Sequence, residues 1–175
     1  IGVKFAIYRG DFCVLNSKKK RIFLINLFVF NILLSQCPEN YSLNPLFLEG
    51  NDYDECVPSE FIYYNSTLFH AYYFEVVLIN DYEISSEDWV GAFNFSDQLY
   101  CVGARRWGVC GGDMCEVLLH GDDGSEPTEG QISTGEYPTF KIFEESSGKF
   151  IQAFPQEDIP FIAFGGSVIG YLQAC

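Results

Sequence analysis

The sequence predicts an all-β fold: an antiparallel β-sandwich, immunoglobulin-like or jelly-roll-like, of about seven or eight strands. Short aromatic and β-branched segments recur after residue 60, turn residues separate them, and no stretch after residue 37 shows sustained helical spacing with caps. The chain has 175 residues, of which 48% are hydrophobic. That is enough for one domain with a buried core, and it excludes a disordered chain.

Residues 18–36 have the three parts of a secretory signal peptide. Four consecutive cations at 18–21 precede an apolar stretch of 13 residues at 22–34 and the small residue Ser35. The apolar stretch is shorter than the roughly 20 residues that span a bilayer. A buried core helix is the alternative, but such a helix rarely begins with four cations. We therefore expect a signal-peptide helix, preceded at 1–17 by an unstructured or spuriously translated leader.

Cleavage after Ser35 or Gln36 would leave residues 37–175 as a secreted or cell-surface chain with 4 basic and 23 acidic side chains. Its net charge is −19, against −14 for the whole chain. Because this charge repels phosphates, we exclude nucleic-acid binding, and we expect no stable membrane span in the exported part. The alternative is a bacterial lipoprotein signal that ends at a lipidated Cys37, although Gln36 stands where that signal has a small residue.

Six cysteines follow the signal peptide, and in an exported chain they predict a disulfide framework. A bridge between Cys37 and Cys56 would tie down the turn-rich N-terminal arm, residues 37–59. Cys110 and Cys115 flank a short glycine-bearing loop, which a second bridge would close.

The same cysteines allow a second interpretation, a zinc site formed by Cys101, Cys110, Cys115 and His120. Their spacing contains no compact pair of zinc ligands, and an oxidising compartment favours disulfides over free thiols. We therefore prefer the disulfides. Cys101 lies in an apolar segment, where a free cysteine behaves as a small buried residue.

Alternating apolar residues predict the strands of a β-sandwich module over residues 60–175. In chain order the expected strands are 69–80, 88–94, 99–107, 114–120, 139–144, 149–154 and 167–173. An acidic loop at 121–130 interrupts them. Since loops on a rigid scaffold often carry binding residues, this loop is the first place where we expect function.

Several motifs in this module occur together. They are DWVGAFN at 88–94, CVGARRW at 101–107, CGGDMC at 110–115, GDDG at 121–124, TEG at 128–130, PTFKI at 138–142 and EDIP at 157–160. This set resembles an extracellular β-rich module of large secreted or surface proteins, particularly from marine bacteria that use type IX secretion. The resemblance covers about residues 60–174 and brings no activity with it. It implies a non-catalytic domain that sits beside other modules of a larger protein.

Asp122, Asp123 and Glu126 of the acidic loop, with Asp113 nearby, carry the oxygen ligands that Ca²⁺ prefers. A bound cation would also reduce the self-repulsion of a very acidic chain. The spacing is not that of an EF-hand. The alternative to a calcium site is therefore an ordinary Asp-Asp-Gly turn in a solvated loop.

Trp89 and Trp107 are candidates for an aromatic platform that stacks on sugars, although alternation along a strand turns many aromatic residues inward. Arg105 and Arg106 form the one basic pair of the exported chain. They are candidates for holding a carboxylated ligand. The alternative is an internal salt bridge with acids such as Glu116.

An enzyme is the rival class of function. The sequence around Ser167 is not G-x-S-x-G, and the chain contains no P-loop and no dinucleotide fingerprint. Paired carboxylates among 23 acids leave glycoside hydrolysis open, because such pairing is spatial. We therefore expect a non-catalytic extracellular binding or structural module, with glycans or neighbouring domains as partners. The alternative is a carbohydrate-binding module attached to a polysaccharide-degrading enzyme.

Overall fold

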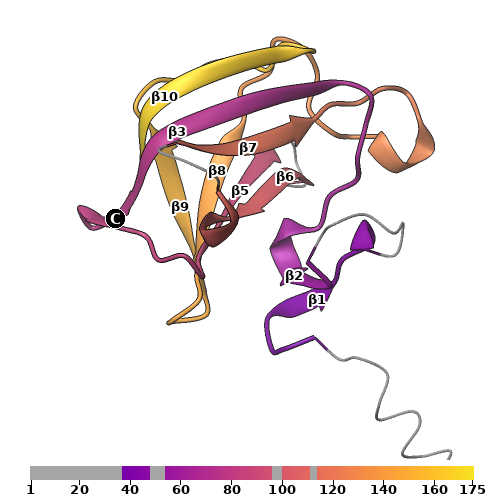
Figure 1. Cartoon of the computed structure of the whole chain (residues 1–175). Coiled ribbons are helices and arrows are strands. Elements are labelled where there is room, and N and C mark those ends of the chain that lie inside the picture. Colours follow the sequence, from indigo (N-terminus) through magenta and orange to yellow (C-terminus); the bar gives the residue numbers. More distant parts are fainter. Residues whose placement is uncertain (1–36, 48–53, 96–99, 111–113) are drawn as a thin grey trace, which may run out of the picture. The chain divides into compact units, whose positions relative to one another are not determined.

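In the computed structural model, the segments with alternating apolar residues pair side by side into one curled sheet (Figure 1). The described residues are 37–47, 54–95, 100–110 and 114–175. Cys37–Cys175 form a compact unit of their own. The expected leader at 1–17, the expected signal peptide at 18–36 and Asp113 lie outside the described residues.

The sheet has eight strands, which confirms the all-β prediction. They are β3 (Phe69–Ile79), β4 (Tyr82–Glu83), β5 (Trp89–Asn94), β6 (Tyr100–Arg106), β7 (Cys115–His120), β8 (Thr139–Glu144), β9 (Lys149–Pro155) and β10 (Gly165–Ala174). Their spatial order is β4-β3-β10-β9-β8-β5-β6, and β7 pairs with β3. None of the described residues belongs to a helix with the length and apolarity needed to cross a bilayer.

One strand pair departs from the expected antiparallel arrangement. β10 runs parallel to β3, with Ser167 opposite Tyr72 and Leu172 opposite Val77. A parallel pair needs a long crossover connection. Here the crossover is the chain between the two strands, which contains β4 to β9, so no local pattern in either strand indicates the direction of pairing.

The two ends of the strand order meet at Gly103. β6 ends the order, whereas β7 lies beside β3 near the other end. A Cβ atom added to Gly103 of β6 would lie 2.1 Å from the carbonyl oxygen of Leu118 in β7. The absence of a side chain at Gly103 therefore lets the two strand backbones approach, and the sheet curls around its core.

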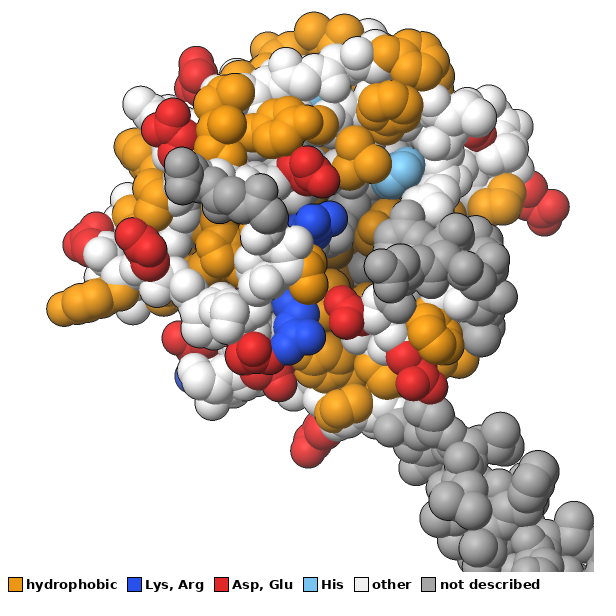
Figure 2. Space-filling view, viewed as in Figure 1, with side chains coloured by type: hydrophobic (Ala, Val, Ile, Leu, Met, Phe, Trp, Pro, Cys, Tyr) orange, Lys and Arg blue, Asp and Glu red, His pale blue; other side chains and the backbone are white. Residues whose placement is uncertain are grey.

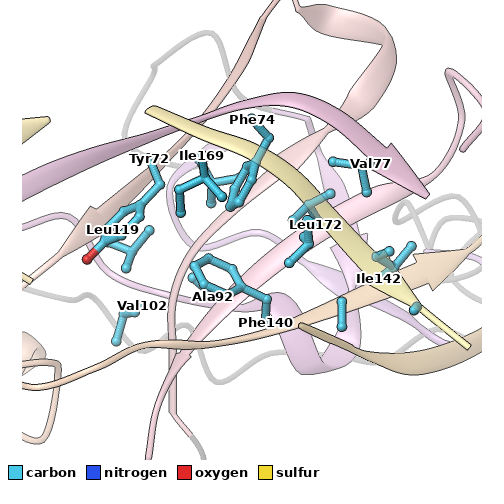
Figure 3. Packing of buried hydrophobic residues seen from close by; sticks show 14 of the residues in the cluster. Tyr72, Phe74, Val77, Ala92, Val102, Leu119, Phe140, Ile142, Ile169 and Leu172 are labelled. Carbon is cyan, nitrogen blue, oxygen red and sulfur yellow. The ribbon is translucent and has the colours of Figure 1, made fainter. Parts of the chain in front are cut away.

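The interior of the curled sheet is filled by aliphatic and aromatic side chains (Figure 3). Phe74 and Phe140 meet edge to face with ring centroids 5.4 Å apart, and Tyr72 lies 5.9 Å from Phe140. Ile169 and Leu172 of β10 are completely buried beside them. Residues from β3, β8 and β10 thus share one core, although they are far apart in the sequence.

The N-terminal arm contains two short strands that the sequence pattern did not predict. β1 (Tyr41–Leu43) pairs with β2 (Cys56–Pro58), and the predicted Cys37–Cys56 disulfide is present beside them, with Cα atoms 5.6 Å apart. Three-residue strands are too short to show alternation. They pair here because the disulfide holds the two segments together.

The second predicted disulfide, Cys110–Cys115, is also present, with Cα atoms 5.2 Å apart. The two disulfides exclude two alternatives from the sequence. The zinc site fails because two of its ligands are bonded to each other, and lipidation of Cys37 fails because its sulfur is bonded to Cys56. Cys101 is a free, buried thiol, as expected, and burial raises its pKa to about 12.

Phe61 joins the arm to the sheet. It ends the 3-10 helix Ser59–Phe61 and is completely buried. Its ring packs edge to face on Phe93 of β5 and Phe150 of β9, at centroid distances of 5.8 and 5.3 Å. A second small core therefore lies between the arm and the outer side of the sheet.

Candidate functional site

A cleft of about 380 Å³ opens between the N-terminal arm and the strands β5, β6 and β7. Figure 2 shows basic side chains in a hollow of one face, with acidic side chains beside them. We call this hollow the arginine cleft. Its polar and aromatic lining comes from the arm (Asn44, Asp54), from Tyr63 after the arm, from β5 and β6 (Trp89, Arg105, Arg106) and from β7 (Glu116, His120).

Three of the four predicted ligand-binding residues line this cleft, and one does not. Trp89, Arg105 and Arg106 lie in its walls, whereas Trp107 packs half-buried against the main core. Trp89 is only 5% exposed and belongs to the small core beneath the arm. The expected open platform of two tryptophans is therefore wrong, because the fold uses both rings largely for packing.

Arg106 is held by acidic neighbours. Its guanidinium donates a hydrogen bond to the carboxylate of Glu87, and it lies 4.0 Å from the carboxylate of Asp54. The hydrogen bond to Glu87 and the charge of both acids raise the pKa of Arg106 above its ordinary value. For Arg106 the internal salt-bridge interpretation holds.

Arg105 is held less completely. Its Nη1 lies 3.8 Å from Oε1 of Glu116, and its Nη2 donates a 3.1 Å hydrogen bond to the carbonyl oxygen of Val109. The expected pair with Glu116 is present, but it is longer than a hydrogen bond. The Nε–H of Arg105 is buried and meets no acceptor in the described part of the chain. Arg105 therefore keeps capacity to donate to a further acceptor.

A second cleft of about 450 Å³, which we call the tyrosine cleft, adjoins the first at Tyr63. Besides Tyr63, it is lined by Tyr64 and Tyr100, by Glu126 and Glu129, and by Gln131. The amide nitrogen of Gln131 donates to the carbonyl oxygen of Tyr64 at 2.8 Å, and its Oε1 is buried without a donor. Sequence reasoning missed Tyr100 and Gln131, because nothing in the sequence indicates that β6 and the acidic loop meet here.

The acidic loop uses its aspartates to hold its own backbone. The Asp123 carboxylate accepts hydrogen bonds from the backbone and hydroxyl of Thr67 at 2.9 and 3.0 Å, and from Ser125 and Thr128. These donors hold the pKa of Asp123 far below its usual range. Asp122 likewise accepts from the backbone of Gly124. This geometry is that of turn-capping aspartates.

The structure therefore gives the expected calcium site no support. Glu126 lines the tyrosine cleft, while Asp122 and Asp123 cap turns, and Asp113 lies outside the described residues. Within the described segments, no three acidic, histidine or cysteine side chains gather as metal ligands. Calcium ligands must converge on one point, which sequence proximity alone does not ensure.

Both histidines serve the packing of the module. In the arginine cleft, the His120 ring stacks on Tyr63 with centroids 5.6 Å apart, and its Nδ1 accepts a hydrogen bond from the backbone of Ser66. His70 is 1% exposed. Its Nε2 lies 2.9 Å from the Ser167 hydroxyl, and its Nδ1 accepts from the backbone of Ile162. Burial lowers the pKa of both imidazoles.

These lowered pKa values predict a loss of stability in mild acid. A histidine whose folded pKa lies below its unfolded value near 6.5 stabilises the fold above that pH, and this contribution is lost as pH falls below it. Each histidine contributes at most about 1.4 kcal/mol per pH unit. We expect the free energy of unfolding of the native unit, measured in urea, to decrease as the pH falls from about 7 to about 5.

The matched protein for this measurement is the double variant His70→Gln/His120→Gln. It keeps every carboxylate, so its own pH dependence reports the acidic residues alone. The native unit should lose more unfolding free energy than the double variant over the same pH range. Equal losses in the two proteins would show that the histidines are not the cause.

Comparisons with known proteins give no information about the site. No family model, no curated protein and no solved structure matches this chain. The two adjoining clefts and the residues that line them are therefore the basis for an inference about function.

Proposed function

We propose that residues 37–175 are a non-catalytic extracellular binding module of a secreted or cell-surface protein. The observation that carries this proposal is the arginine cleft, which the disulfide-tied arm and the curled sheet build together. Its volume is within the usual range for ligand sites, and it combines aromatic walls with a few charged groups. A domain that served only as a spacer would not need such a concave surface.

The extracellular location is supported by the cysteines. Both disulfides need an oxidising compartment to persist. The unit also carries a net charge of −19. The charge keeps the domain soluble and repels anionic surfaces. The sequence resemblance to modules of large secreted or surface proteins agrees with this location and suggests neighbouring domains as further partners.

The non-catalytic character is supported by the surroundings of the histidines. His120 is engaged by a backbone N–H and by the stacked ring of Tyr63. The pair of His70 and Ser167 resembles a base and nucleophile in its 2.9 Å separation, but the other ring nitrogen meets backbone atoms of Ile162 rather than a carboxylate. His70 is also buried in the core, so substrate cannot approach it.

A second candidate function is carbohydrate binding on behalf of an attached polysaccharide-degrading enzyme. The tyrosine cleft favours it, since Tyr64 and Tyr100 are 44% and 43% exposed and carboxylates of Glu126 and Glu129 lie in the same lining. Aromatic faces stack on sugar rings, and carboxylates accept hydrogen bonds from sugar hydroxyls.

The test is affinity electrophoresis of residues 37–175, made in an oxidising compartment, through gels that contain neutral or acidic soluble polysaccharides. A parallel assay measures newly formed reducing ends. We expect retardation in at least one gel without new reducing ends. New reducing ends would make the protein a hydrolase, and unchanged mobility in every gel would remove the carbohydrate-binding candidate.

The variant Cys37→Ser/Cys56→Ser is the structural control for the same gels. Removing this bridge loosens the arm that forms one wall of the arginine cleft, at a cost of about 3 kcal/mol of unfolding free energy. We expect weaker retardation by the variant while its sheet stays folded. Unchanged retardation would mean that the arm plays no part in binding.

A further inference from the structure

Two lining residues of the arginine cleft carry a buried N–H that meets no acceptor among the described residues, the Nε–H of Arg105 and the indole N–H of Trp89. The indole lies near enough to the Tyr41 hydroxyl to influence its pKa, but no hydrogen bond between them is complete. A buried donor without an acceptor costs about 1–3 kcal/mol, so a ligand that brings oxygen acceptors is favoured here.

Positive charge is also concentrated in this cleft. Residues 37–175 contain four cations, and two of them, Arg105 and Arg106, line it. Lys141 is paired with Glu60 elsewhere, and Lys149 stands exposed at the start of β9. In a unit with 23 acidic residues, an anionic ligand meets repulsion over most of the surface. In the arginine cleft the two arginines balance the lining acids Asp54 and Glu116, so an anion meets less repulsion here than over the acidic surface.

The two arginines differ in how completely other groups of the protein pair their guanidinium groups. Arg106 is occupied by Glu87 and by Asp54. Arg105 has only a 3.8 Å contact to Glu116 and one hydrogen bond to a carbonyl. A guanidinium binds a carboxylate best through two parallel N–H groups. The Arg105 side chain is 35% exposed, its Nη1 has only the 3.8 Å contact, and its Nη2 keeps one N–H besides the bond to Val109.

The adjoining tyrosine cleft indicates the kind of molecule that carries the anion. Tyr63 lines both clefts, so a ligand in one cleft lies beside the other. The second cleft offers tyrosine rings and acceptor carboxylates, which suit sugar rings and their hydroxyls. An acidic peptide would instead place its charges against Glu126 and Glu129.

From these observations we infer that the arginine cleft binds the carboxylate of a uronic-acid saccharide, with Arg105 as the residue that holds the carboxylate. The inference rests on the proposed binding function and names its ligand class. The uronate ring occupies the arginine cleft against Tyr63, and the next sugar lies in the tyrosine cleft. The carboxylate oxygens accept hydrogen bonds from the Arg105 guanidinium, which lies 3.8 Å from the Glu116 carboxylate.

The test is titration calorimetry of residues 37–175 with an aldobiouronic acid, a disaccharide of one uronate and one neutral sugar, and with its methyl ester, which has the same rings without the charge. We expect the acid to bind at least about tenfold more tightly than the ester, which is the effect of one charge-assisted hydrogen-bonded pair. Arg105→Gln should abolish that difference. Lys149→Gln, which removes one exposed positive charge outside the lining of both clefts, should leave the affinity unchanged within about twofold.

A second variant keeps the test decisive if Arg105→Gln folds poorly. Glu116→Gln removes the acid that contacts Arg105, so the aldobiouronic acid should bind more tightly to it than to the native unit. Equal affinity for acid and ester, weaker binding by Glu116→Gln, or binding of a glutamate-rich peptide in place of the uronate would each overturn the inference. If neutral polysaccharides still retard the protein in gels, the proposed binding function survives that failure.

Discussion

Replacing Gly103 by alanine is expected to destabilise the unit by more than about 3 kcal/mol, a large part of the 5–15 kcal/mol that small domains possess. The new Cβ would lie 2.1 Å from the carbonyl oxygen of Leu118 and 3.2 Å from the Cα atom of Leu119. Both contacts are to backbone, so no side chain can rotate away. β6 and β7 would have to separate where the sheet closes, and urea unfolding followed by tryptophan fluorescence measures the loss.

Gly166→Ala is the matched control for this prediction. Gly166 is also a strand glycine, but the nearest atoms to its added Cβ are 3.8 Å away, at ordinary contact distance. Its unfolding free energy should change by less than about 1 kcal/mol, since alanine in an extended strand is favourable wherever it fits. If both variants are equally stable, the close approach of β6 and β7 at Gly103 is wrong.

Phe61→Ala is expected to cost about 3–5 kcal/mol of unfolding free energy, as do other deletions of a fully buried phenylalanine. Phe61 is completely buried, and its ring contacts Phe93 and Phe150 of the sheet. The substitution would leave a cavity between the arm and the sheet. Because the arm forms a wall of the arginine cleft, we also expect weaker ligand binding at temperatures where the variant is still folded.

Phe154→Ala separates this effect from a general loss of phenylalanine. Phe154 lies in β9 and is 64% exposed, so its removal should change the unfolding free energy by no more than about 0.5 kcal/mol. The measurement is the denaturant midpoint of the native unit, of Phe61→Ala and of Phe154→Ala under the same conditions. A Phe61→Ala protein as stable as the native unit would show that the arm does not share a core with the sheet.

The strands of the sheet show what local sequence can predict. β3, β5, β7, β8 and β9 begin and end within about one residue of the ranges expected from alternation and turn residues. These segments succeed because strand formation depends on neighbouring side chains, which the sequence contains in order. β1 and β2 were missed because three residues cannot display a period.

The disulfides could be predicted for a related reason. Cys110 and Cys115 are separated by four residues, so a short loop brings them together, and Cys37 and Cys56 enclose one turn-rich arm. The parallel pairing of β3 with β10 had no such local signal. It depends on where the chain returns after β4 to β9, which is a property of the whole sheet.

The candidate site was predicted only in part. Arg105, Arg106 and Trp89 were identified from their residue types, but their grouping with Tyr63 and His120 depends on how the arm lies across β6 and β7. The calcium interpretation found no support among the described residues. Neighbouring aspartates in the sequence turned out to cap their own loop, because backbone N–H groups nearby compete for their oxygens.

The sequence by itself determined the all-β class, the main strands and both disulfides, since each follows from neighbouring residues or from residue composition. Only the tertiary structure decided which strands meet at the curl, which arginine remains incompletely paired, and that Tyr63 lines two neighbouring clefts. The physical reason is distance along the chain. A binding site needs groups from segments tens of residues apart, and only packing brings such groups to one place.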